Sequence, residues 1–192
     1  MDTLLLDKNN IRARALGARK AIKPDEAQHA AQKLSVHLFK CIPESARIVG
    51  GYMAIHGEIS IAAAMAALHA RGHTLALPVV VGEGKPLVFR KWQPGDALEK
   101  GAYGIDVPPA TASEVIPDAV IVPLAAFDKD GHRLGYGAGY YDKTIPKMRA
   151  QKKDILLIGA AFAQQQVEKV PADEHDRKLD VVVTEKGVVT FT

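Results

Sequence analysis

The chain begins with apolar residues at helical spacing and continues with short apolar runs that are typical of strands. Residues 2–40 predict two helices divided at Pro24. In the second helix, Ala27, Ala31 and Leu34 recur every three or four residues, which places them on one face. We therefore expect an amphipathic helical segment to precede the rest of the fold.

From residue 46 onward, strand-length apolar runs alternate with helical segments. A helix over 61–71 has Ser60 as its cap and Gly72 as its stop. Another helix follows a glycine-rich stretch and reaches about Lys152, with a kink expected at Pro146. The predicted strands span residues 46–55, 73–81, 86–92, 119–128, 154–163 and 179–191, the last as a short hairpin. This alternation predicts an α/β fold with a mainly parallel sheet and helices on both faces.

Composition narrows the class of protein. The 192 residues predict a single domain, residues 1–192, in which helices 2–40 pack on an α/β core formed by 46–192. The formal charge of +3 argues against a nucleic-acid partner. The apolar runs are too short for a membrane span or a signal peptide, so we expect a cytoplasmic protein without a membrane partner. The single cysteine, Cys41, excludes an internal disulfide and fits a reducing compartment.

A glycine-rich stretch, GHRLGYGAGYYDK at residues 131–143, is the strongest candidate for a binding loop. It fits neither the Walker A pattern nor the dinucleotide-binding fingerprint. Alternate glycines before a helix would let successive backbone N–H groups face an anion, and Arg133 could add a guanidinium. The alternative is a plain strand-to-helix turn. The YYD that follows weakens this alternative, because it offers a stacking surface and a metal ligand.

Two acidic residues are further candidates. Glu58 lies between a buried strand and a helix start, where it either faces a ligand or is a solvated acid favoured by the helix dipole. Position alone does not separate these two interpretations. Asp180 opens the last strand and, by position alone, is one of several surface acids. No serine lies in a G-x-S-x-G motif, which excludes the nucleophile elbow of α/β-hydrolases.

The segment VPLAAFDKDGHRLGYGAGYYDK, residues 122–143, resembles the signature of the 5-formyltetrahydrofolate cyclo-ligase family, also called 5,10-methenyltetrahydrofolate synthetases. The resemblance extends over nearly the whole chain. It includes the segments KNNIR at 8–12, YMAIHGEIS at 52–60, FRKWQPGDALEKGAYGIDVP at 89–108 and KLDVVVTE at 178–185.

This resemblance implies a three-layer α/β/α fold of the NagB/RpiA/CoA-transferase-like type. It also implies cyclisation of 5-formyltetrahydrofolate to 5,10-methenyltetrahydrofolate with ATP and Mg²⁺. Catalytic roles would fall to Glu58, Arg133 and Tyr140, folate contacts to Met53, Glu58, Trp92 and Tyr140, and Mg²⁺ ligation to Asp142 and Asp180. ATP would be bound by Lys8, Asn9, Asn10, Ile11, Arg12, Arg133, Leu134, Gly135, Tyr136, Gly137, Ala138, Gly139, Tyr140 and Tyr141.

The chain departs from the family pattern within the loop. Many members carry basic residues between the loop glycines, where this chain has Tyr136 and Ala138. Two other functions stay open at this point. One is a sugar-phosphate isomerase or CoA-transferase-like enzyme on the same architecture, and the other is a non-catalytic folate- or nucleotide-binding protein. The expected partners are ATP and 5-formyltetrahydrofolate, and we expect a monomer.

Overall fold

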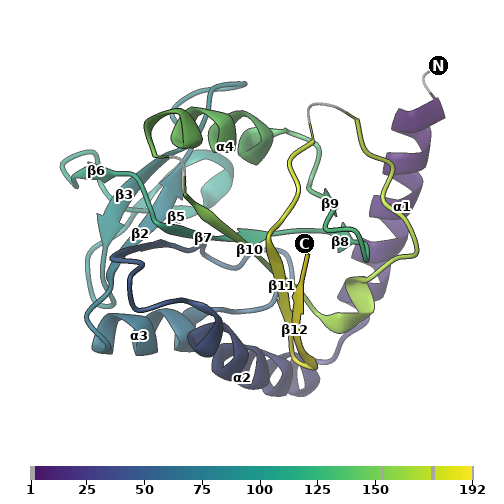
Figure 1. Cartoon of the computed structure of the whole chain (residues 1–192), viewed down its shortest axis with the longest axis horizontal. Helices are drawn as coiled ribbons and strands as arrows, with labels where there is room; N and C mark the ends of the chain where they lie inside the picture. Colours follow the sequence, from purple (N-terminus) through teal and green to yellow (C-terminus); the bar gives the residue numbers. More distant parts are fainter. Residues whose placement is uncertain (1–2, 153, 174–175, 192) are drawn as a thin grey trace.

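The computed structural model describes residues 3–152, 154–173 and 176–191, and a mixed eight-stranded sheet forms its centre (Figure 1). The strand order is β12-β11-β10-β7-β1-β2-β3-β6, in which β11, β10, β7, β1 and β2 are parallel and the other three pair antiparallel. These strands are β1 Ile48–Gly50, β2 Thr74–Val79, β3 Val88–Trp92, β6 Glu114–Val115, β7 Ala119–Pro123, β10 Leu156–Ala160, β11 Val181–Thr184 and β12 Gly187–Thr190. The mainly parallel sheet and the terminal hairpin are as predicted.

Helices cover both faces of the sheet, which confirms the three-layer prediction (Figure 1). Helices α2 (Pro24–Cys41) and α3 (Ala62–Ala70) pack on one face, where Leu34 and Leu68 are fully buried. Helix α4 (Tyr140–Gln151) covers the other face through Ile145 and Met148, and it continues through Pro146. Burial of these apolar side chains is the main source of stability for such a layered fold.

Helix α1 (Thr3–Lys20) belongs to neither layer and lies beyond the carboxyl ends of the parallel strands (Figure 1). Its buried residue Ala15 packs with Ala126, Leu134 and Val170. Ala126 and Leu134 belong to a small separate hairpin of β8 (Ala126–Phe127) and β9 (Arg133–Leu134). Ligands of parallel α/β sheets bind at this edge, so α1 is placed beside the expected site. The remaining short elements are β4 Glu99–Lys100, β5 Asp106–Val107, η1 Ala102–Gly104 and η2 Ala163–Gln165.

The predicted strand over 119–128 is wrong in extent, because β7 ends at Pro123. Proline has no N–H to continue a ladder. Two residues later, Ala125 N–H donates to the Leu134 carbonyl at 2.7 Å, so the backbone has already joined the β8–β9 hairpin. This break moves the glycine-rich stretch from the end of a sheet strand to the end of a hairpin, next to α1.

The predicted strand over 46–55 is also shorter, since β1 ends at Gly50. The chain is tightly enclosed at this point. A Cβ atom built on Gly50 would lie 2.7 Å from the Phe89 ring, and one on Gly51 would lie 2.5 Å from Met65. The following residues leave the sheet and form the loop that carries Glu58.

Gly159 in the middle of β10 provides a stability test of this close packing. A Cβ atom there would lie 2.6 Å from Leu179 and 2.8 Å from Leu124. We expect Gly159→Ala to lower the free energy of unfolding by about 1–3 kcal/mol, as overpacking does in cores. Gly17 is the matched control, because it lies in α1 with open space around its Cα. Gly17→Ala should raise the free energy of unfolding by about 0.5–1 kcal/mol. Urea denaturation of both variants measures the difference, and equal effects would contradict the packing.

Candidate functional site

The loop after β1 holds Glu58 in a tight turn. The Glu58 N–H donates to the Ile55 carbonyl at 2.9 Å, and the Ile55 N–H donates back to the Glu58 carboxylate at 3.0 Å. His56 and Gly57, between them, both have positive φ, 50° and 77°. A positive φ is uncommon for residues other than glycine, so contacts from elsewhere in the chain help to hold this turn. The turn fixes the backbone from which the Glu58 side chain projects.

Arg19, near the end of α1, supplies the contact that holds this turn. Its side chain is buried, with 4% of the residue exposed. One guanidinium nitrogen donates to the His56 carbonyl at 2.9 Å, and the other donates to the Tyr136 hydroxyl at 2.6 Å. Arg19 was not among the residues predicted from sequence, because nothing in the local pattern separates it from its basic neighbours on α1.

Glu58 is partly removed from water, and this changes its acidity. Burial raises the pKa of Glu58 above its ordinary value of 4.5, while hydrogen bonds from Tyr136 and the Ile55 amide and the charge of Arg19 oppose the rise. Glu58 also lines a cavity of about 400 Å³ between α2 and α3, together with Gln28, Ser60 and Phe162. This volume lies in the range of small-molecule sites. The interpretation of Glu58 as a freely solvated acid does not fit these surroundings.

The glycine-rich loop lies against α1. Arg12 Nε donates to the Gly135 carbonyl at 2.8 Å, and a Cβ atom on Gly137 would lie 3.8 Å from the Arg12 guanidinium carbon. Gly137 and Gly139 have φ of 102° and 66°, which explains glycine at both positions by backbone conformation alone. Gly135 is different. Its φ is not positive, and a Cβ atom there would meet none of the described residues within 4 Å. The absence of a side chain at Gly135 leaves open space in which a ligand can approach the backbone.

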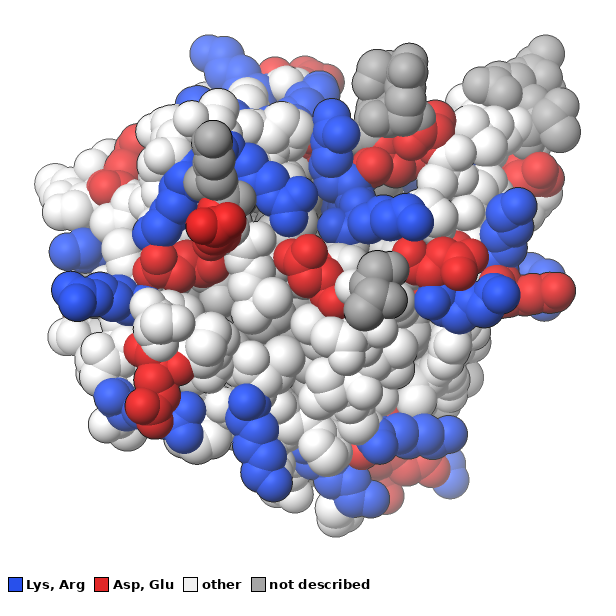
Figure 2. Space-filling view, in the orientation of Figure 1, with Lys and Arg blue, Asp and Glu red and all other residues white. Residues whose placement is uncertain are grey.

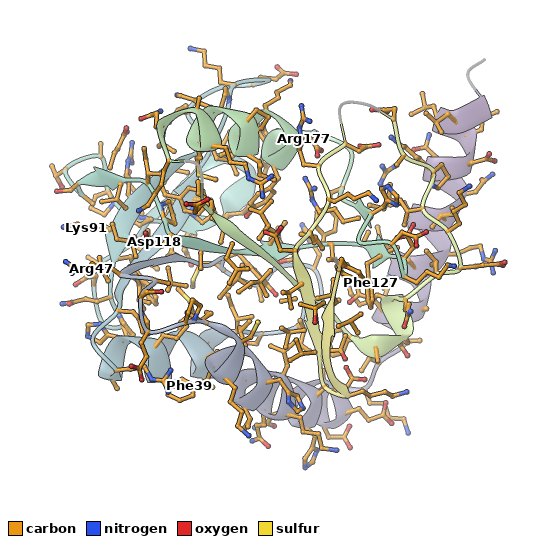
Figure 3. The ribbon with its side chains drawn as sticks, viewed as in Figure 1. Phe39, Arg47, Lys91, Asp118, Phe127 and Arg177 are labelled. Atoms are coloured by element: carbon orange, nitrogen blue, oxygen red, sulfur yellow. The ribbon has the colours of Figure 1, made fainter. Side chains whose placement is uncertain are left out.

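Helix α4 begins directly after this loop, with Gly139 at its N-cap and no side-chain cap. The first N–H groups of such a helix have no partners within the helix, and its N-terminus carries partial positive charge. Asp142 in the first turn pairs with Arg133 at 2.7 Å, and Arg133 also donates to the Arg177 carbonyl. Arg133 is buried, with 8% exposed, so its guanidinium orients Asp142 from behind the loop. Figure 3 shows Arg177 beside this end of α4.

Lys8 lies one helical turn before Arg12, as predicted, and faces a different segment. Its ammonium group pairs with Asp173 at 3.0 Å and with Asp176 at 2.6 Å. These carboxylates raise the pKa of Lys8 against the opposing effect of desolvation, which is the largest single influence. Asn9 accepts a hydrogen bond from Arg12 at 2.6 Å, whereas Asn10 is exposed. Lys8 and Arg12 therefore present two cations along the α1 side of the loop.

The other residues of the predicted ATP segments divide into packing and surface positions. Ile11 and Leu134 pack in the small apolar cluster that docks α1. Ala138 is exposed at the top of the loop. Burial raises the pKa of the Tyr141 hydroxyl above its usual range, and Glu58 and Tyr136 add to this effect. Tyr141 thus links the start of α4 to the surroundings of Glu58.

Tyr140 meets a residue that sequence reasoning missed. The Tyr103 and Tyr140 hydroxyls are hydrogen-bonded at 2.8 Å, and their rings pack edge to face with centroids 6.3 Å apart. Tyr103 has a positive φ of 58° and is 69% exposed, at the tip of the long connection between β3 and β6. A large exposed aromatic side chain on a strained turn is a signal of binding. The length of this connection was the only hint in the sequence.

Two predicted site residues lie at the opposite edge of the sheet. Trp92 pairs with Leu75 at the amino end of β2 and packs toward the α2–α3 core. Asp180 precedes β11, where its carboxylate accepts the Leu157 N–H at 2.7 Å and lies 3.6 Å from Arg149 in the last turn of α4. The structure therefore brings neither Trp92 nor Asp180 to Glu58 or Asp142. Met53 is half-buried in the loop that leads to Glu58.

Asp118 has the same kinds of contact as Asp180 and indicates a structural role for both. Asp118 precedes β7, accepts the N–H of Ile48 in the adjacent strand at 2.8 Å, and pairs with Lys152 directly after α4 (Figure 3). Asp180 has the same kinds of partner at the start of β11. Both carboxylates satisfy a strand N–H at the amino edge of the sheet. Asp142 and Asp180 lie near opposite ends of α4, which is too far apart for shared ligation of one ion.

Among the described residues, Asp128, Asp130 and His132 also have atoms close enough for a metal ion. Asp128 is fully buried and accepts the N–H groups of Asp130, His132 and Val170 at 2.9–3.0 Å. Backbone bonding of this kind lowers the pKa of Asp128 against its burial. The carboxylate is engaged by the chain itself and shapes the β8–β9 turn.

The visible charge pattern is mixed. Figure 2 shows Lys and Arg side chains above the sheet, over α4 and beside it, with acidic side chains among them. This face carries no unbroken basic stripe. No helix of the described residues is both long and apolar enough to cross a bilayer.

Comparison with known proteins is decisive at this point. Residues 6–185 match the model of the 5-formyltetrahydrofolate cyclo-ligase family. The chain belongs to this family. The 5-formyltetrahydrofolate cyclo-ligase of Haemophilus influenzae is 34% identical over 164 residues, which cover 81% of this chain and 87% of that protein. The Escherichia coli K12 protein of the same name is 31% identical over 177 residues, which cover 88% and 96%.

Solved structures agree with the cyclo-ligase family. The 5,10-methenyltetrahydrofolate synthetase of Aquifex aeolicus is 30% identical and superposes with a TM-score of 0.78, covering 95% of this chain and 92% of that one. The 5,10-methenyltetrahydrofolate synthetase of Mycoplasma pneumoniae, 22% identical with a TM-score of 0.75 and coverage of 93% and 99%, supports the fold. The resemblance stated from the signature is confirmed, and the isomerase or CoA-transferase-like alternative is not supported.

The pKa of Glu58 generates a prediction about stability. Because the pKa of Glu58 is raised in the folded protein, the native state keeps the proton to higher pH than the unfolded chain. The protonated Glu58 carboxyl therefore makes its full contribution to the stability of the folded protein below pH 4.5. This contribution is lost as pH rises through the pKa that Glu58 has in the folded protein. We therefore expect Glu58→Gln to gain stability relative to the wild type as pH rises from about 4 to about 8. Denaturation midpoints across this range measure it.

Glu44 supplies the control, since its side chain is exposed. The stability of Glu44→Gln should follow that of the wild type across the same pH range. A Glu58→Gln variant that also follows the wild type would show that Glu58 is solvated like Glu44.

Proposed function

We propose that the protein catalyses ATP- and Mg²⁺-dependent cyclisation of 5-formyltetrahydrofolate to 5,10-methenyltetrahydrofolate, releasing ADP and phosphate. One observation supports the proposal in addition to family membership. The cationic side of α1, the glycine loop and Glu58 come together at the carboxyl edge of the sheet through Arg12 and Arg19. A phosphate site and an acid with altered acidity are thus adjacent, as transfer of a phosphoryl group to the folate requires. A non-catalytic binding protein would not need this pairing.

The triphosphate is proposed to lie over the glycine loop. Gly135 leaves open space, the uncapped start of α4 provides N–H groups, and Lys8 and Arg12 line the α1 side. Backbone amides at a helix start and nearby cations are the usual partners of phosphate. For Lys8 to contact phosphate, its ammonium must exchange Asp173 and Asp176 for phosphate oxygens, which are also anionic acceptors.

Asp142 is the residue we propose for Mg²⁺. It lies in the first turn of α4, 31% of its side chain is exposed, and Arg133 holds one carboxylate oxygen. Mg²⁺ is commonly bound by one or two carboxylates with water and substrate phosphates completing the shell, so Asp142 fits without Asp180. When bound, the ion would supply positive charge to the transferring phosphoryl group.

The chemistry follows from the weakness of a formamide as an electrophile. The formyl oxygen attacks the γ-phosphorus, the bond to ADP breaks, and the formyl carbon becomes an activated iminium phosphate. The neighbouring folate nitrogen then attacks that carbon and loses its proton, and phosphate leaves. Lys8 and Arg12 would neutralise charge during phosphoryl transfer, which depends mostly on position and electrostatics. Glu58 would orient the pterin or accept the proton, since a carboxylate with a raised pKa is a better proton acceptor than an exposed one.

The folate is proposed to contact the loop and cavity beside Glu58. The cavity of about 400 Å³ offers Phe162 and the Gln28 side chain, and Met53 lies in the same loop as Glu58. Tyr103 and Tyr140 provide aromatic surface at the start of α4, which replaces the role predicted for Trp92. A monomeric state, a cytoplasmic location, the single-domain organisation over 1–192 and the absence of nucleic-acid and membrane partners stay predictions.

Turnover tests the proposal directly. The purified protein should convert 5-formyltetrahydrofolate with Mg-ATP into a product with methenyl absorbance, and it should form no product without ATP or with excess EDTA. A folded sample that gives no methenyl product at any ATP or Mg²⁺ concentration would overturn the proposal.

Gly135→Val tests the phosphate site separately from stability. The position has no positive φ and no close neighbour, so valine should leave the melting temperature nearly unchanged. If phosphate approaches this backbone, the added side chain should weaken ATP binding at least about tenfold, or about 1.4 kcal/mol. Titration calorimetry with ATP compares it with Gly17→Ala, which should bind as the wild type does. Wild-type ATP affinity in Gly135→Val would show that the loop is only a structural turn.

A further inference from the structure

Tyr136 lies on the exposed glycine loop, and its hydroxyl points to the protein. The residue is 42% exposed. Its hydroxyl accepts a hydrogen bond from Arg19 at 2.6 Å, and the Arg19 guanidinium carbon lies 5.4 Å from the centre of its ring. A tyrosine that served only to cover the loop would not need its oxygen placed on a buried guanidinium.

The donor rules of these groups determine where the tyrosine proton goes. A guanidinium has N–H donors and no acceptor, so the Tyr136 oxygen must be the acceptor towards Arg19. The Tyr136 proton is then available for another partner. That partner is the Glu58 carboxylate, whose charge interacts with the Tyr136 hydroxyl. The chain of contacts therefore runs from Arg19 to Tyr136 to Glu58, with each group in the role that its chemistry allows.

The second guanidinium nitrogen of Arg19 stabilises the backbone turn that carries Glu58. It donates to the carbonyl of His56, whose positive φ of 50° belongs to the turn closed by Ile55 and Glu58. One guanidinium thus fixes both the turn that carries Glu58 and the hydroxyl that contacts its carboxylate. Arg19 is 4% exposed, so water cannot replace these partners easily.

We propose that Tyr136, held by Arg19, is the positioning residue that orients the Glu58 carboxylate and couples it to the glycine loop. The inference rests on the proposed function, in which Glu58 faces the folate. The side chain at loop position 136 therefore serves Glu58. Binding of ATP at the loop and orientation of the folate at Glu58 are then linked through one hydroxyl.

The charged and titratable groups around Glu58 set the direction of the expected change. Tyr136, Arg19 and His56 favour its carboxylate form, and the Tyr52 and Tyr141 hydroxyls lie in its field. Removing the Tyr136 hydroxyl or the Arg19 charge takes away a partner of the carboxylate. The pKa of Glu58 should therefore rise further in Tyr136→Phe and in Arg19→Gln.

The experiment compares Tyr136→Phe, Arg19→Gln and the double variant with Arg14→Gln, a matched change at an exposed position of the same helix. Carbon-13 NMR follows the Glu58 carboxyl, assigned by its loss in Glu58→Gln, and turnover is measured across pH. We expect each single variant to raise the Glu58 pKa by about one unit and shift the pH–rate profile by as much. We also expect a loss of about tenfold or more in kcat/KM for the folate, with a smaller change in KM for ATP.

The double variant should lose about as much as Arg19→Gln alone, because the effect of Tyr136 on Glu58 depends on the contact with Arg19. Arg14→Gln should keep the wild-type Glu58 pKa and kcat/KM. An unchanged Glu58 pKa in folded Tyr136→Phe would overturn the positioning role, as would a loss confined to melting temperature. The NMR readout does not need turnover. If the wild type forms no methenyl product, the proposed function fails while the NMR titration still decides whether Tyr136 and Arg19 control Glu58.

Discussion

A buried guanidinium must have its donors satisfied within the protein, and at Arg19 this requirement determines how the site is assembled. Leaving such a charge unpaired costs several kcal/mol, more than an exposed ion pair contributes. The partners of Arg19 come from the loop after β1 and from the loop before α4, which are far apart in sequence. Docking of α1 therefore brings together two loops that the sheet alone would leave independent.

The parallel sheet supplies the edge at which these contacts form. β7 leaves the sheet after Pro123, and the β8–β9 hairpin that follows presents the glycine loop to α1. Small apolar residues make this docking close, since Ala15 packs directly on Ala126 and Leu134. Arg12 and Arg19 then contact the loop at two points on the same helix. The residues of the family signature therefore form a site only when α1 is docked against the hairpin.

Much of this architecture could be predicted from sequence, because local periodicity and strand-length apolar runs specify the order of elements and the layers. The glycine loop and Glu58 were also predictable, through the signature and the position after β1. Trp92 and Asp180 were assigned to the site by resemblance, and the structure places both at the opposite edge. The edge of the sheet at which a residue lies depends on strand direction and register. No local sequence pattern specifies these two properties. Arg19 and Tyr103 were missed for the same reason, since their importance comes from partners distant in sequence.

The central claim is that ATP binds the glycine loop against α1, and amide hydrogen exchange with and without Mg-ATP tests it most directly. The amides of residues 135–142 and the part of α1 around Arg12 should exchange more slowly when Mg-ATP is bound. The turn at 55–58 should also gain protection, because Arg19 and Tyr136 connect it to the loop. Protection confined to other segments, with the loop and α1 unchanged, would contradict the account.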